Sequence, residues 1–375
     1  MYLPRASIDS VLGAIKKMGL GPSDTALILL GEKNAPDLSK LVETLRRAGV
    51  KFAGAVFPGI LHGHEACFEG AILLSMPVLR DPIVIKHLDR EVTAMPDFGP
   101  EIAERSGNHY TAIVLADALC SNISPFLREL FNLLGNSAHY IGGGAGSLSL
   151  KQKPCVFTAE GVFQNAVVIC FAGLSSSLGV RHGWENLAGP VVATQTAQNT
   201  IVELNWRKAF DVYREIVEAD YGKTITRNTF FEIAKFYPFG IIKEGAEDIV
   251  RDPLTLNDRG GLVCAGDIPE NAVLNILKAR PERLIEAADQ AAENSLDFKN
   301  GQPRQCLVAD CISRTLVLDK RFSEELAKVE HRIQNAHSAL VPEGILSLGE
   351  ISSYGDGYIE FFNKTIVVGV LYHAE

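Results

Sequence analysis

The sequence predicts a mixed α+β fold, of the α/β type, with two domains in which β-sheets are flanked by helices. Short apolar runs of strand length alternate with helical patterns, as in proteins whose sheets are covered by helices. The chain has 375 residues, which is too long for a single hydrophobic core of ordinary size, so two domains are expected. The same order of predicted elements recurs in the second half, which indicates an internal duplication.

The elements of the first half follow one another with short connections. A helix, a strand, a helix and two strands are predicted, in that order, at residues 7–18, 25–31, 37–49, 51–57 and 70–76. After a polar stretch at residues 95–110, the run "TAIVLADAL" at 111–119 has the β-branched content of a buried strand. These elements predict helices packed on a sheet.

A long helix is expected to end the first domain. Residues 204–222 carry apolar side chains at helical spacing, and the predicted buried face consists of Trp206, Phe210, Tyr213, Ile216 and Val217. Beyond this helix, turn residues punctuate the chain and open the second domain. The predicted domains are therefore residues 1–225 and 226–375.

The predicted repeat consists of a strand, a helix, a strand, a glycine-rich turn and a hairpin. The first copy runs from "AIVLADAL" to "VFQNAVVICF", and the second runs from "QCLVADCIS" to "YIEFFNKTIVVGVL". In this comparison Asp117 matches Asp310, and Asn165 matches Asn363. We favour duplication over the alternative that two α/β segments share a common pattern by chance.

The stretch "IGGGAGS" at residues 141–147 has the glycine content of a phosphate-binding loop. A dinucleotide-binding fingerprint needs a helix directly after its glycines, whereas "SLSLKQKPCVFTAEG" predicts a loop followed by a β-hairpin. Ser147 also stands where the third glycine of that fingerprint is required. We therefore expect these glycines to serve close backbone approach or positive φ angles where a strand bends.

Composition and charge exclude several classes of function. The net charge of −9 and the lack of a basic stripe disfavour nucleic-acid binding. No apolar run reaches the length of a membrane span, and the first residues lack the pattern of a secretory signal. The seven cysteines include no C-x-x-C pair, which argues against a disulfide framework and a zinc knuckle. A cytoplasmic location is expected.

A small polar ligand such as an amino acid needs a cation for its carboxylate and an acceptor for its ammonium group. Arg314 can offer a fork of N–H groups to a carboxylate, and Glu350 can accept an ammonium. In the alternative interpretation, Arg314 pairs with Asp310 and Glu350 in a structural ion network, and Asn363 fixes the hairpin backbone. The candidate ligand-binding residues are Arg251, Asp310, Cys311, Arg314, Glu350 and Asn363, with Asp252 at the rim.

Two further groups of residues have chemistry of their own. Cys311 lies near Arg314, which could lower its thiol pKa and make it a nucleophile or redox sensor, but no histidine of the motif can act as its base. A buried structural cysteine is the alternative. His62 and His64 share a strand face if the segment is extended, and with Glu65 they could bind a metal, although no third histidine ligand is evident nearby.

Six segments together resemble the FIST family: "IGGGAGS" with "VFTAEGVFQNAVV", "HGWENLAGP", "RDPL", "DCISRTLVL", "LGE" and "FFNKTIVV". They cover nearly the whole chain in the order expected for an N-terminal FIST domain followed by a C-terminal one. The resemblance implies a sensory module of signal transduction that recognises small molecules such as amino acids, with no established catalytic activity. The segment "FAGAVFPGILHGHEACFEGAILLSM" further resembles stand-alone bacterial members, some of which bind haem, sense nitric oxide and act on histidine kinases.

The resemblance makes His182, in "RHGWE", the candidate haem ligand, with Trp184 as an apolar wall. A histidine satisfied by backbone groups at a turn is the alternative. The expected function is a small-ligand sensor that acts through a separate partner such as a histidine kinase, because the chain carries no kinase or receiver segment of its own. A haem-dependent nitric-oxide sensor and an enzyme that uses Cys311 are the alternatives.

Overall fold

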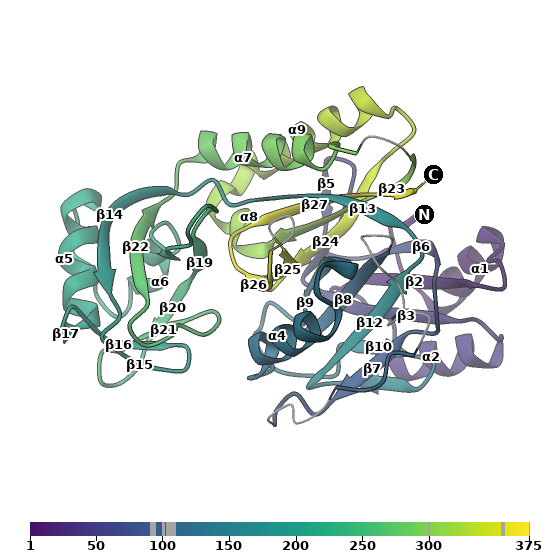
Figure 1. The fold of residues 1–375 in the computed structure, drawn as a ribbon, viewed down its shortest axis with the longest axis horizontal. Coiled ribbons are helices and arrows are strands. Elements are labelled where there is room, and N and C mark those ends of the chain that lie inside the picture. The colour runs from purple at the N-terminus through teal and green to yellow at the C-terminus, as the bar shows by residue number, and fades with distance from the viewer. Residues whose placement is uncertain (91–94, 100–101, 103–109, 299–300, 354–356, 375) are drawn as a thin grey trace.

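The computed structural model describes residues 1–90, 95–99, 102, 110–298, 301–353 and 357–374. Figure 1 shows a larger and a smaller lobe. Among the described residues, the larger lobe contains three six-stranded sheets, and the smaller lobe contains the two sheets built from β14 to β22. The chain enters the smaller lobe after β13 and leaves it towards α7, so this lobe is an insertion into the larger one. The predicted mixed α+β fold is confirmed.

The larger lobe consists of three units with one order of elements: an edge strand, a strand, a helical segment, a parallel strand, a hairpin and a returning strand. The first unit comprises β1 (Tyr2–Leu3), α1 (Ile8–Met18), β2 (Asp24–Gly31), α2 (Leu38–Arg47), β3 (Phe52–Phe57), β4 (Gly59–His62), β5 (Glu65–Cys67) and β6 (Ala71–Pro77). The helices and strands predicted up to residue 76 are thus confirmed, to within two residues at each end.

The second and third units repeat this order. The second comprises β7 (Ile83–Lys86), β8 (Thr111–Asp117), α4 (Ile123–Leu134), the 3₁₀ turn η1 (Gly135–Ser137), β9 (His139–Ala145), β10 (Val156–Thr158), β11 (Gly161–Phe163) and β12 (Ala166–Ala172). The third comprises β13 (Ser175–Arg181), α7 (Pro281–Asn294), β23 (Gln302–Cys311), α8 (Ile312–Leu318), η2 (Asp319–Arg321), α9 (Phe322–Ala336), β24 (Pro342–Ser347), β25 (Glu350–Ser353), β26 (Ile359–Phe362) and β27 (Ile366–His373). The predicted duplication is present, and the first unit is a further copy of it.

Each unit gives its hairpin to the sheet of another unit. Hairpin β10–β11 pairs with β3 of the first unit, β25–β26 pairs with β9 of the second, and β4–β5 pairs with β24 of the third. The resulting strand orders are β1-β6-β2-β3-β10-β11, β7-β12-β8-β9-β25-β26 and β13-β27-β23-β24-β4-β5. Every unit is therefore bonded to both others, and the predicted boundary at residues 225 and 226 falls inside the smaller lobe.

In every unit a glycine of the second parallel strand lies against the backbone of the first. A Cβ atom there would lie 2.3, 1.8 and 1.8 Å from a carbonyl oxygen in the pairs Gly54 with Ile28, Gly142 with Val114, and Gly344 with Val308. Only glycine fits such an approach. Gly142, Gly143 and Gly144 of "IGGGAGS" therefore continue strand β9, with the close backbone approach that was expected, and Gly146, with φ 145°, follows the end of that strand.

These equivalent glycine pairs correct the residue matches of the predicted repeat. The pairing places Asp117 level with Cys311, and not with Asp310. Asp117 and Asp310 lie on opposite faces of their strands, because side chains alternate along a strand. In the same way Asn165, with φ 49°, is level with Lys364, with φ 55°, and not with the preceding asparagine. The sequence comparison was therefore wrong by one residue at both the aspartate match and the asparagine match.

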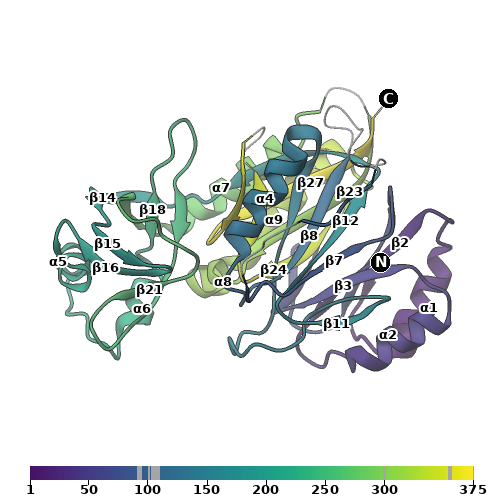
Figure 2. The ribbon, with the colours of Figure 1, turned by 60° about the horizontal axis from the view of Figure 1, so that its bottom comes forward.

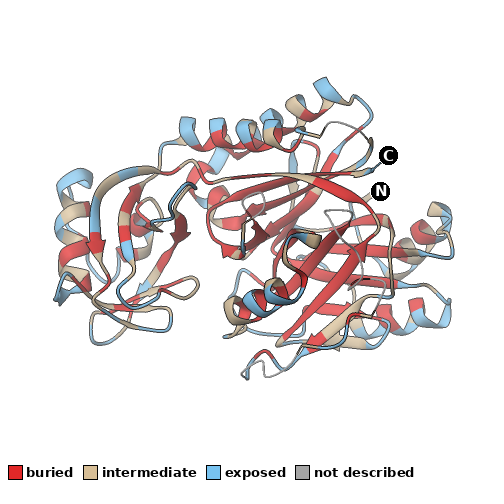
Figure 3. Cartoon of the chain, viewed as in Figure 1, coloured by how far each residue is buried: buried red, intermediate tan, exposed pale blue. Residues whose placement is uncertain are grey.

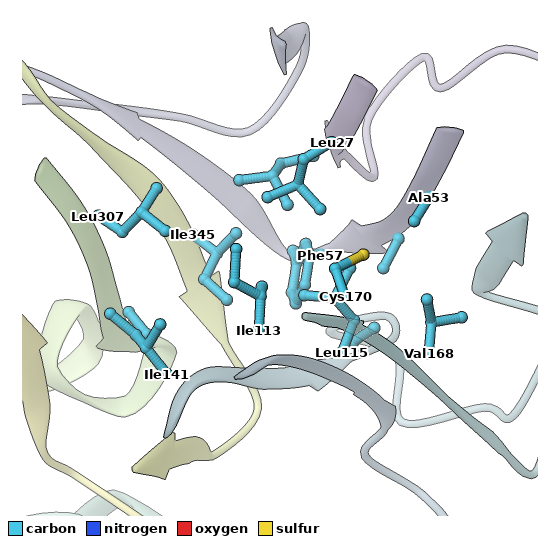
Figure 4. Packing of buried hydrophobic residues seen from close by; sticks show 14 of the residues in the cluster. Leu27, Ala53, Phe57, Ile113, Leu115, Ile141, Val168, Cys170, Leu307 and Ile345 are labelled. Carbon is cyan, nitrogen blue, oxygen red and sulfur yellow. The ribbon is translucent and has the colours of Figure 1, made fainter. Parts of the chain in front are cut away.

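The three sheets pack their inner faces into one core. Figure 4 shows Leu27, Ile113, Leu115 and Leu307 in this cluster, each from the first parallel strand of its unit, which is β2, β8 or β23. Helices α1 and α2 cover the outer face of the first sheet, α4 covers that of the second, and α7 to α9 cover that of the third. Figures 2 and 3 show the strands buried between these helical layers. Within the described residues, no helix is long and apolar enough to cross a membrane.

The smaller lobe has its own core around two sheets and two helices. Its elements are β14 (Glu185–Val192), β15 (Gln195–Ala197), β16 (Thr200–Leu204), β17 (Arg207–Lys208), α5 (Ala209–Tyr221), α6 (Phe230–Ala234), β18 (Phe239–Ile241), β19 (Ile249–Arg251), β20 (Pro253–Leu256), β21 (Leu262–Cys264) and β22 (Val273–Lys278). The prediction of one helix over residues 204–222 is wrong at its start. Asn205 and Trp206, with φ 50° and 57°, turn the chain between β16 and β17, and Trp206 is 80% exposed.

Candidate functional site

Arg314 lies on α8 with no exposed surface, and all of its N–H groups donate to other parts of the protein. Its Nε and Nη2 bind the two oxygens of Glu325 at 3.0 and 2.6 Å. Nη1 donates to the carbonyl oxygens of His182 at 2.6 Å and Lys364 at 3.1 Å, and Nη2 donates to that of Leu284 at 2.9 Å. Five bonds match the five donors of a guanidinium, so Arg314 has no fork left for a carboxylate ligand.

The structure places the predicted partner of Arg314 at the edge of this network. Asp310 Oδ1 lies 3.4 Å from Nε, whereas Glu325 of α9 takes the bidentate position. Burial, and then the nearby Glu325 carboxylate, raise the pKa of Asp310 well above its usual range. Sequence spacing pointed to Asp310 because it lies four residues before Arg314. Glu325 could have been found as a carboxylate within the buried stripe of Phe322, Leu326 and Val329.

Glu350 begins β25 and is completely buried. It accepts hydrogen bonds from the Ser347 hydroxyl at 2.5 Å and the Thr365 backbone N–H at 3.2 Å, and it also interacts with the Cys311 thiol. Burial raises the pKa of Glu350 to about 8. Its partners are thus turn and strand residues of its own unit, and it lies behind the cavity described below.

The raised pKa of Glu350 makes stability depend on pH. Between the ordinary pKa of 4.5 and about 8, the unfolded chain ionises this carboxyl while the folded protein keeps its proton, so stability falls as pH rises. Glu350→Gln should flatten this decline, because the amide does not titrate. Urea unfolding at about pH 5 and about pH 8 measures both slopes. An equal decline in both proteins would contradict the role of Glu350.

His182 is bound on several sides and buried to 5% exposure. Its Nδ1 accepts the Trp184 backbone N–H at 2.8 Å, and its own backbone N–H donates to Glu247 at 2.8 Å. Burial, and then the charge of Arg314, lower the pKa of His182 to about 3, so the ring is neutral. With Nδ1 occupied, the proton lies on Nε2, and neither nitrogen offers a free lone pair. The residues around His182 therefore do not fit an axial haem ligand.

The histidines of "LHGHE" are directed to separate carboxylates of the third unit. His62 Nδ1 lies 3.2 Å from Glu343, and His64 Nδ1 lies 2.7 Å from Glu330. Glu65 pairs across the hairpin with His62 along the backbone. Among the described residues, no group of three or more His, Cys, Asp or Glu side chains is arranged to hold a metal ion.

A cavity of about 650 Å³ lies between the two lobes. Its lining comes from residues within 118–124 and 311–316 of the larger lobe, and within 198–199, 252–254 and 264–267 of the smaller lobe. The larger-lobe segments follow the carboxyl ends of β8 and β23, where the chain enters α4 and α8. Loops at the carboxyl ends of parallel strands are a usual place for a ligand site. The volume is that of a small-molecule pocket.

Two side-chain oxygen atoms that belong to lining residues are buried and have no hydrogen-bond partner in the protein. They are Oδ1 of Asp252 and Oδ1 of Asn363, whose residues are 1% and 2% exposed. The other oxygen of Asp252 accepts from Lys364 Nζ at 3.0 Å and from the Ser313 hydroxyl at 3.1 Å. An unpaired buried acceptor is costly, so these atoms favour a ligand that donates hydrogen bonds.

The predicted site residues divide into two groups. Cys311 and Asn363 line the cavity, together with Asp252. Arg251 ties the lobes together, because its Nε donates to the Asp267 carbonyl at 2.9 Å and its Nη1 to the Phe361 carbonyl at 3.1 Å. The remaining members of the predicted set are buried in the protein and are not part of the lining: Arg251, Asp310, Arg314 and Glu350.

A mixed α+β protein with a polar-ended cavity between two lobes has the features of a small-molecule-binding protein. Comparison of the chain with models of known protein families identifies its family. The FIST N domain model matches residues 25–207, and the FIST C domain model matches residues 209–353. The chain therefore belongs to the FIST family, whose domains are associated with sensory small-ligand binding in signal transduction. The two matches meet at the start of α5, within the smaller lobe. A search of curated proteins found no match.

Proposed function

We propose that this protein is a sensor whose small ligand occupies the cavity between the lobes. The main support is that two lining residues, Asp252 and Asn363, each carry a buried oxygen with no hydrogen-bond partner in the protein. A ligand that donates hydrogen bonds to both would remove the cost of leaving them unpaired. Because both lobes line the cavity, ligand binding would change how they hold together. The response then passes to a separate signalling protein such as a histidine kinase.

An amino acid can donate hydrogen bonds to Asp252 and Asn363 through its ammonium group. Its carboxylate would need other donors, because Arg314 is saturated by protein groups. The first turn of α4 supplies them, since Ile123 and Ser124 line the same cavity and the N-terminus of a helix favours negative charge. An amino acid could therefore place its ammonium group at Asp252 and Asn363 and its carboxylate at the first turn of α4, which carries only a partial positive charge.

The two alternatives receive less support. A haem-dependent nitric-oxide sensor that used His182 would have to break the hydrogen bond from Trp184 to free a lone pair for iron. An enzyme that used Cys311 would need a thiolate, whereas burial raises the pKa of the Cys311 thiol well above its usual range. The proposal therefore assigns neither haem ligation nor catalysis to these residues.

A binding screen tests the proposal. Thermal unfolding with a panel of amino acids, their amides and amines should reveal a stabilising ligand, and a ligand at about 100 times its Kd should add about 2.7 kcal/mol to the free energy of unfolding. Calorimetry then gives the affinity and stoichiometry. If no compound of a broad panel shifts the transition, the proposed function is wrong.

The variant Leu316→Trp tests whether the ligand binds in the cavity. Leu316 lines the cavity and is 44% exposed, so a larger ring there should fill the opening without disturbing the core. We expect the affinity for the ligand to fall at least tenfold, about 1.4 kcal/mol, while the unliganded protein keeps its thermal stability. The matched control is Leu133→Trp on α4, which is 54% exposed and outside the lining. Equal ligand affinity in both variants would show that the ligand binds outside the cavity.

A further inference from the structure

The charge of the cavity lining selects the charge of a ligand. Asp252 and Asp267 line the cavity, and no lysine or arginine of the described residues does. Burial keeps the lining thiols of Cys264 and Cys311 protonated by raising each thiol pKa, so they add no charge. Lys364 pairs with one oxygen of Asp252 at 3.0 Å and offsets its charge, so the net negative charge of the lining comes from Asp267, and the other oxygen of Asp252 has no donor in the protein. This environment favours a cation or a neutral donor over an anion.

The open side of the cavity is apolar. Leu148, Leu150 and Leu316 line it and are 44%, 53% and 44% exposed. The loop that carries the first two is held in place, because the Leu148 N–H donates to Glu32 at 3.2 Å and the Leu150 N–H to the Ser147 carbonyl at 2.9 Å. Three exposed leucines around one opening form a surface that gains free energy when an apolar group covers it.

The backbone of Leu150 is a second observation that favours a binding role for this apolar surface. Its φ angle is 52°, in the left-handed region that asparagine and glycine adopt far more readily than leucine. An apolar residue is thus kept at a strained and exposed position, next to the opening. Such strain is found where the side chain has a task in binding.

The size of the cavity separates a single amino acid from a larger ligand. Its volume of about 650 Å³ lies within the range of about 300–1,000 Å³ that drug-sized ligands occupy. A free amino acid bound at Asp252 and Asn363 would leave much of the apolar lining in contact with water. A ligand with a longer apolar body would cover the leucines as well.

We infer that the ligand is an amphiphilic amine. Its protonated nitrogen donates to Asp252 Oδ1 and Asn363 Oδ1 at the buried end, and its apolar body, longer than an amino-acid side chain, extends along Leu148, Leu150 and Leu316. A carboxylate next to the amine is not required. This inference rests on the proposed function, of which it specifies the ligand class.

Four six-carbon probes test the inference by calorimetry at neutral pH: hexylamine, hexanol, hexanoate and norleucine. Hexylamine should bind at least tenfold more tightly than each of the others, because it alone combines the cation with an unobstructed chain. Affinity should rise about fourfold for each added methylene from butylamine to octylamine. If norleucine binds and hexylamine does not, the inference is overturned and the proposed sensor stands. If the broad panel also fails, both are wrong.

Two variants separate the ends of the site. Asn363→Leu removes one acceptor at similar volume and should lower hexylamine affinity at least tenfold, while hexanoate affinity should not fall because a carboxylate donates no hydrogen bond. Leu150→Asn removes the apolar side chain without backbone strain, because asparagine tolerates the left-handed region, and should reduce the gain per methylene. Circular dichroism verifies folding, and the chain-length series in Leu150→Asn stands even if Asn363→Leu does not fold. Unchanged amine preference in Asn363→Leu, or an unchanged gain per methylene in Leu150→Asn, overturns the inference.

Discussion

Replacement of Arg314 by methionine is expected to lower the free energy of unfolding by about 3–5 kcal/mol, because it breaks a buried ion pair from one side. The change removes the bidentate partner of the Glu325 carboxylate and leaves the carbonyl oxygens of His182, Lys364 and Leu284 without these donors. Those residues belong to α9, to the start of the smaller lobe, to the turn before β27 and to α7. The loss should therefore appear as a lower midpoint of urea unfolding in both lobes.

A surface arginine provides the control. Arg321 pairs with Glu282 and Glu324, but its side chain is 39% exposed, so solvent screens these pairs. Arg321→Met should shift the unfolding midpoint only slightly. If Arg314→Met does not fold, Arg314→Lys keeps the charge without the fork and should give an intermediate loss. A midpoint for Arg314→Met as high as that of the surface variant would show that the buried network contributes little.

Gly142→Ala is expected to destabilise the protein by about 3 kcal/mol or to prevent folding. The added Cβ would lie 1.8 Å from the Val114 carbonyl oxygen and 2.7 Å from its carbon, so β8 and β9 would have to separate. Gly13→Ala should act in the opposite direction. Gly13 lies inside α1 with no atom within 4 Å of the added Cβ, and alanine favours a helix by about 0.5–1 kcal/mol over glycine.

Thermal and urea unfolding of the two alanine variants measure this difference in sign. A small effect at Gly142 would mean that the close approach of β8 and β9 can relax. Destabilisation at Gly13 would mean that the helix is constrained by contacts beyond those of its own face. Either result contradicts the structural account of the glycine concerned.

Local patterns predicted the elements well, because burial imposes a period on the sequence. The apolar run of β8 and the amphipathic spacing of α2 define a strand and a helix without reference to the rest of the chain. The exchange of hairpins between units could not be predicted in this way. A hairpin carries the same alternation whether it extends its own sheet or another, and three-residue strands such as β10 hold little information on their partner.

The sequence did not reveal the main partner of Arg314, because distance along the chain does not give distance in space. Arg314 and Asp310 lie four residues apart and were paired for that reason, but Glu325 on the next long helix has the better geometry. Cys311 and Asn363, which the sequence predicted as ligand-binding residues, line the cavity, although the sequence did not show that the smaller lobe supplies the opposite wall. That wall depends on how the smaller lobe packs against the larger one, and no local sequence pattern indicates this packing.

The cyclic exchange of hairpins also sets the order in which the protein can be completed during synthesis. The sheet of the first unit can close once β10–β11 has left the ribosome, but β9 must wait for β25, and the hairpin β4–β5 must wait for β24. Until those late strands emerge, the nascent chain exposes the unpaired edges of β9 and β4. The third unit, which is translated after the other two, therefore completes their strand pairing, and a chain that ends before β24 is expected to aggregate.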